Sequence, residues 1–95
     1  MKQVCTRKQA LDLMAEAFSV GARKDATPDR SAGEILEGMV DYMEGHNQPE
    51  GVVCWVMRDF CELEGIEIDD PAEIDWIDLR FHFTAKMETL AEDAA

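Results

Sequence analysis

Apolar residues recur every three or four positions in four stretches of this chain, which is the spacing of an α-helix with one buried face. The first stretch predicts a helix over 7–20. Thr6 and Gln9 stand at its start, where each side chain can satisfy a backbone donor of the other residue in a capping box. Gly21 is predicted to end this helix, because glycine readily adopts the left-handed conformation of a helix stop.

The second stretch predicts a helix that ends at Gly45. Two starting points fit its sequence. Pro28 suits the first helical position, with Thr27 as the capping residue. Alternatively the helix starts at Ser31, which forms a second capping box with Glu34.

A third stretch predicts a helix over 52–64 that stops at Gly65. Its first turns are rich in β-branched residues, so a short strand over 52–57 is the alternative. The length of the pattern favours the helix, and its apolar first two turns suggest that it is the central, most buried one. The segment that follows is expected to be extended, with Ile66 and Ile68 facing inward.

The fourth helix is predicted over 71–91, with Asp70 as its cap and Glu73 completing a third capping box. Apolar and polar residues also alternate over 77–83, which is typical of a strand. The start signal and the length of the apolar pattern favour the helix.

Together these stretches predict an all-α fold, a compact bundle of about four helices, with a short strand around 77–83 or 52–57 as the alternative. The 95 residues form one domain, 1–95, with room for one core, and the tail 92–95 is expected to fray. No apolar run approaches the roughly 18 residues of a membrane span, and the N-terminus does not resemble a secretory signal. We therefore expect a cytoplasmic protein.

The cysteines and histidines offer no recognisable chemistry. Cys5, Cys54 and Cys61 lack a metal-binding spacing, and the last two stand about 10 Å apart along a helix, too far for a disulfide. They are expected to be reduced, partly buried thiols. Neither His46 nor His82 has a serine or cysteine placed by sequence for activation. No catalytic residue, no metal site, no cofactor and no enzyme activity is predicted.

Charge is unevenly distributed along the chain. Twenty-one acidic residues against nine basic ones give a net charge of −12. Residues 1–30 hold six bases and four acids, whereas residues 31–95 hold three bases and seventeen acids. Such a field repels nucleic acid and anionic membranes and attracts cationic surfaces. We therefore expect a protein partner with a basic surface, and no direct binding of nucleic acid or membrane.

The second helix carries an acidic edge without an interleaved base: Glu34, Glu37, Asp41 and Glu44. These carboxylates rise over about 15 Å, or one charge per ~5 Å, compared with one per 3.4 Å along a single DNA strand. Like charges at i, i+4 each cost about 0.2–0.5 kcal/mol. A net charge of roughly −2 to −8 would already keep a small domain soluble, so this acidity exceeds what solubility needs.

These observations favour a non-enzymatic interaction protein, an inhibitor whose carboxylate face docks on a basic nucleic-acid-binding surface of its partner. Small acidic DNA mimics of phages and mobile elements block restriction or CRISPR complexes in this way. The comparison rests on size and charge, since no motif identifies a family. The predicted contact residues are Glu34, Glu37, Asp41, Glu44, Asp59, Glu62, Asp69 and Asp70.

The alternative is a small helical adaptor or a homodimeric structural protein. Apolar residues cover more of the fourth helix than one core contact needs. Trp76, Leu79 and Phe83 lie on one side of this arc and are the predicted apolar interface.

Overall fold

The computed structural model describes residues 3–45, 51–70 and 75–94. In chain order these residues form β1 (Gln3–Cys5), α1 (Arg7–Asp25), α2 (Ala32–Gly45), α3 (Gly51–Glu64), β2 (Ile66–Ile68) and α4 (Trp76–Ala94). The predicted all-α bundle is confirmed, with a small two-stranded sheet added to it.

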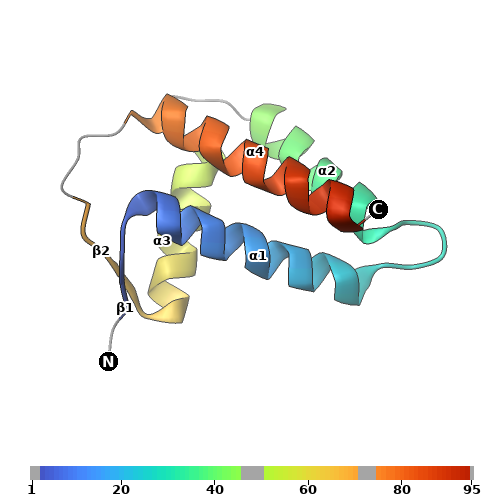
Figure 1. The fold of residues 1–95 in the computed structure, drawn as a ribbon, viewed down its shortest axis with the longest axis horizontal. Helices are drawn as coiled ribbons and strands as arrows, with labels where there is room; N and C mark the ends of the chain where they lie inside the picture. Colours follow the sequence, from blue (N-terminus) through green and yellow to red (C-terminus); the bar gives the residue numbers. More distant parts are fainter. Residues whose placement is uncertain (1–2, 46–50, 71–74, 95) are drawn as a thin grey trace.

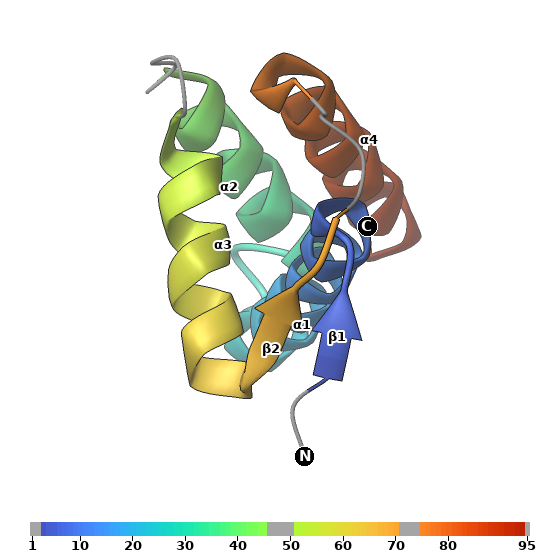
Figure 2. The same cartoon turned by 90° about the vertical axis from the view of Figure 1, so that its left-hand side faces the viewer.

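The core lies between α1, α2 and α4, which pack on one another (Figures 1 and 2). The largest fully buried side chains among the described residues are Leu11, Met14, Leu36, Leu79, Phe83 and Met87 in these three helices and Cys54 in α3. The Phe83 ring meets that of Phe18 edge to face, with centroids 6.3 Å apart and planes at 81°. Burying a large apolar side chain such as Phe83 contributes about 1.5–3 kcal/mol, and an edge-to-face ring pair adds about 0.5–1.5 kcal/mol.

The start of α1 follows its predicted chemistry, but its end does not. The Gln9 backbone nitrogen donates to Thr6 Oγ1 at 3.2 Å, and the Thr6 nitrogen donates to Gln9 Oε1 at 2.9 Å, so the capping box is confirmed. The predicted stop at Gly21 is wrong, because α1 continues to Asp25. A glycine inside a helix costs about 1 kcal/mol. The following Ala22 is 1% exposed in the core, and its packing favours continuation of the helix.

The later of the two predicted starts of α2 is confirmed. The Glu34 backbone nitrogen donates to Ser31 Oγ at 3.2 Å, and the Ser31 hydroxyl donates to the Glu34 carboxylate at 3.4 Å. Thr27 instead closes a tight turn with Arg30, in which the two backbones exchange hydrogen bonds of 2.9 and 3.2 Å. Pro28 belongs to that turn and not to a helix.

Both disputed segments are helical, so the alternative strands over 52–57 and 77–83 are wrong. The expectation that the third helix is the most buried one is also wrong, since α3 lies beside the bundle formed by α1, α2 and α4 (Figure 2). It buries one side, including Met57, while Trp55 is 69% and Leu63 84% exposed. A high apolar content therefore did not make this helix central.

The fourth helix begins later than predicted. Residues 71–74, which include the predicted capping partner Glu73, lie outside the described residues. Asp75 is not helical, and its side chain accepts a hydrogen bond from the Ile77 backbone nitrogen at 3.1 Å, so Asp75 caps α4. At the other end α4 continues beyond Ala91, which is 2% exposed, into the tail expected to fray.

The two strands pair in parallel, with Gln3 opposite Ile66 and Cys5 opposite Ile68 (Figure 2). The Asp69 nitrogen extends this ladder by donating to the Cys5 carbonyl at 2.9 Å. Ile66 and Ile68 are half-buried, as expected for the extended segment. No sequence pattern predicts β1, a strand of 3 residues. The sheet joins the N-terminus to the end of α3.

Candidate functional site

The predicted acidic edge of α2 exists as one surface. Glu34, Glu37, Asp41 and Glu44 are all exposed, and their spacing of three and four residues places them on one flank of α2. The helical spacing that predicted this edge is therefore realised in the structure.

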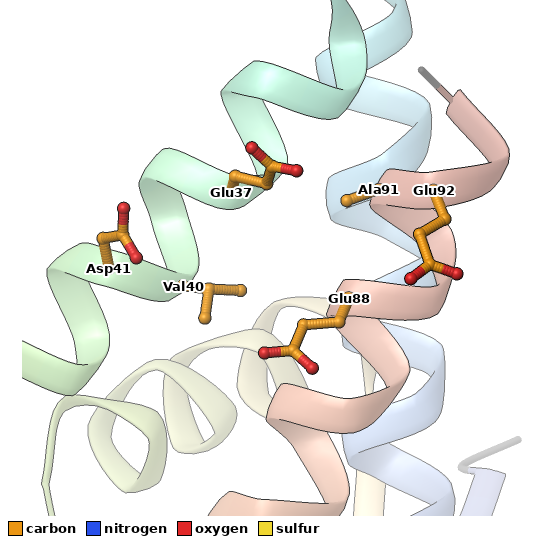
Figure 3. Close-up of a pocket in the computed structure, with 6 residues that line it drawn as sticks. All are labelled: Glu37, Val40, Asp41, Glu88, Ala91 and Glu92. Carbon is orange, nitrogen blue, oxygen red and sulfur yellow. The ribbon is translucent and has the colours of Figure 1, made fainter.

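A shallow groove of about 330 Å³ lies between α2 and α4 and adjoins this edge (Figure 3). It is lined by Glu37, Val40, Asp41, Glu88, Ala91 and Glu92. Each helix contributes two carboxylates. The α4 pair was absent from the predicted contact residues, although its i, i+4 spacing repeats that of Glu37 and Asp41.

The bottom of the groove is apolar and its sides are acidic. Val40 is 7% and Ala91 2% exposed, so both are packed into the core with only a small surface facing the groove. In Figure 3 the carboxylates of α2 and of α4 stand on the two sides of these residues. Such a site suits lysine or arginine, whose aliphatic stem can lie on apolar atoms while its charged head remains polar.

The four carboxylates of this groove, hereafter the groove carboxylates, have no ion-pair partner in the described parts of the chain. Among the described residues, ion pairs join Arg7 to Asp70 and Lys86 to Glu16, and a hydrogen bond joins His82 to Asp12. Within each helix the groove carboxylates are i, i+4 neighbours, and such like-charge pairs are mutually repulsive. The groove is thus a concentration of uncompensated negative charge.

Three other predicted contact residues are exposed but lie elsewhere. Asp59 and Glu62 are on α3, and Asp69 follows β2. None of the three lines the groove between α2 and α4. The predicted contact residues therefore do not form one continuous face. The α2 carboxylates lie beside those of α4, whereas Asp59, Glu62 and Asp69 lie outside this groove.

Asp70 is not part of the exposed acidic face, unlike the other predicted contact residues. Its side chain is 6% exposed and accepts hydrogen bonds from Nε of Arg7 at 3.1 Å and from the Arg7 backbone nitrogen at 3.2 Å. This contact fastens the end of β2 to the first turn of α1. No local pattern predicts this pairing, because the two residues are 63 positions apart in the sequence.

The residues of the predicted apolar interface on the last helix are packed into the core and do not form an exposed surface. Leu79 is 0% and Phe83 1% exposed, and the partly buried Trp76 packs against the same core. The exposed apolar side chains of α4 are instead Ile77 at 50% and Phe81 at 66%. The solvent-facing side of the apolar arc is therefore the one that carries Ile77 and Phe81.

On its opposite flank α4 makes polar side-chain contacts with α1. His82 Nε2 lies 2.8 Å from Asp12 Oδ1, and Lys86 Nζ lies 3.5 Å from Glu16 Oε1. The partners of His82 and Lys86 are Asp12 and Glu16, which lie on α1, far away in the sequence. The spacing of residues within α4 therefore could not predict these contacts. Exposed pairs of this kind contribute about 0–1 kcal/mol, so they add little to the stability of the packing between α1 and α4. His46 lies outside the described residues.

The three cysteines are free and buried. Burial, with a smaller effect from nearby Cys5, raises the pKa of the Cys61 thiol. A protonated thiol is a poor nucleophile and a poor metal ligand. Among the described residues, no group of three or more histidine, cysteine or acidic side chains is placed to hold a metal ion.

No protein-family model matches this chain, and neither a curated protein nor a solved structure matches it significantly. The geometry and charge of the chain itself are therefore what bears on its function. In the described ranges none of the helices combines the length and apolar character needed to cross a bilayer.

Proposed function

We propose that this chain is a non-enzymatic inhibitor that uses the acidic groove between α2 and α4 to bind a basic, nucleic-acid-binding surface of another protein. The supporting observation is that two helices line this groove with four carboxylates, which no cation of the described residues neutralises.

Binding would pair the groove carboxylates with lysines and arginines of the partner. Hydrogen bonds between ionised groups are stronger than neutral ones, and an arginine guanidinium can grip a carboxylate with two of them. The stem of such a side chain would rest on Val40 and Ala91, which form the apolar bottom of the groove. Glu34 and Glu44 extend the acidic row along α2 in both directions. The lysines and arginines of the partner that are paired with these carboxylates can no longer bind the phosphates of a nucleic acid.

Charge also gives this interaction its expected kinetics. A net charge of −12 attracts a cationic surface over a distance and accelerates encounter at low ionic strength. Binding relieves the repulsion within each i, i+4 pair, about 0.2–0.5 kcal/mol for each. Salt screens both effects, so affinity should fall steeply as ionic strength rises.

Restriction and CRISPR complexes are the proposed class of target. Both hold nucleic acid on extended basic surfaces, and small acidic proteins of phages and mobile elements act on them by mimicry. The size and net charge of this chain, and the row of carboxylates along α2, support this assignment.

The test compares three immobilised baits in a cell lysate: the wild-type chain, a groove variant and a control variant. The groove variant carries Glu37→Gln, Asp41→Asn, Glu88→Gln and Glu92→Gln. The control variant removes equally many exposed charges outside the groove, through Asp29→Asn, Asp59→Asn, Glu64→Gln and Glu67→Gln. Captured proteins are eluted with a salt gradient, identified, and assayed for binding to duplex DNA and to RNA with and without added wild-type chain.

We expect the wild-type and control baits to retain the same nucleic-acid-binding protein and to release it below about 0.5 M salt, and the groove variant to retain none. Added wild-type chain should displace DNA or RNA from that protein. The proposal fails if all three baits retain the same proteins, if salt does not elute them, or if the captured protein binds nucleic acid equally well in the presence of the chain.

A second candidate function is a helical adaptor or homodimer that associates through α4. It is favoured by Ile77 and Phe81, which are exposed and stand one helical turn apart. Sedimentation of the wild-type chain and of a Phe81→Asp variant distinguishes the candidates. A dimer that is lost on substitution and persists at high salt supports self-association, whereas a monomeric wild-type chain excludes the homodimer.

A further inference from the structure

We draw no further inference here: the strongest candidate, the shallow groove between β1 and α1 along the outer edge of the two-stranded sheet, is a surface for which nothing in the structure shows what covers it.

Discussion

Removing the groove carboxylates is expected to stabilise the free protein. Glu37 and Asp41 repel each other on α2, and Glu88 and Glu92 do so on α4. Each i, i+4 pair costs about 0.2–0.5 kcal/mol, so the groove variant should gain about 0.4–1 kcal/mol in free energy of unfolding. Repulsion between the two helices across the groove acts in the same direction.

The control variant separates this local effect from the general effect of charge. It reduces the magnitude of the net charge by the same amount, and none of its residues has a like-charged neighbour at i, i+4 on the same helix. Asp59 has one at i, i+3, Glu62, whereas in the groove variant Glu37 and Asp41 have two at that spacing, Glu34 and Glu44. Glu64 is the last residue of α3 and Glu92 lies in the last turn of α4, so both variants also relieve an acid at the negative end of a helix dipole. The difference between the variants therefore reports the groove pairs.

Urea unfolding followed by far-UV circular dichroism is the appropriate assay, because urea adds no charge. At about 0.01 M salt the free energy of unfolding of the groove variant should exceed that of the control variant by about 0.4–1 kcal/mol. At about 1 M salt, where the Debye length is near 3 Å, the advantage should disappear. If the groove variant is no more stable than the control variant at low salt, the groove carboxylates do not destabilise the free protein by repulsion. The same conclusion follows if the difference in stability between the variants is unchanged at high salt.

Three further predictions concern the fold, and urea unfolding measures each. Phe83→Ala should cost about 3–5 kcal/mol because this ring is 1% exposed, whereas Phe81→Ala at a 66% exposed ring should change stability by less than about 0.5 kcal/mol. Equal losses would indicate a strand, in which both rings share a face. Asp70→Ala should cost about 1.5–3 kcal/mol by removing the charge-assisted hydrogen bonds that Arg7 donates to this carboxylate, and Asp70→Asn should cost less; no loss in either variant would contradict the structural role of this contact. Burial raises the pKa of Cys61, so above the ordinary thiol value of 9.0 the unfolded chain loses its proton first and stability falls with rising pH. Between about pH 8 and about pH 10 the free energy of unfolding of Cys61→Ala should fall less steeply than that of the wild-type chain. Identical slopes would contradict a raised pKa of Cys61 in the folded protein.

The helices could be predicted because their signals are local. A hydroxyl and a partner side chain three residues later mark the starts of α1 and α2, and the apolar spacing distinguishes helix from strand over both disputed segments. The end of α1 could not be predicted in this way. Gly21 is a plausible stop by its own chemistry, and the packing of Ala22 against distant residues decides otherwise.

The remaining errors come from contacts between distant segments. β1 has three residues and exists because it pairs with β2, more than sixty positions away. Asp70 looks like an exposed cap until Arg7 is placed beside it. The acidic edge of α2 was predictable from spacing, but Glu88 and Glu92 join it only because α4 packs against α2.

The two flanks of α4 differ in charge, and this difference favours a specific role for the acidic groove over a general requirement for solubility. Toward α1, this helix presents His82 and Lys86, each within 4 Å of a carboxylate. Toward α2, it presents Glu88 and Glu92 to two further acids. A requirement for solubility acts on the whole surface and would be met equally well if the charges on the two flanks were exchanged or mixed. A helix that is matched on one side and unmatched on the other is what a binding surface for a cationic partner requires, because only the unmatched side gains from meeting one.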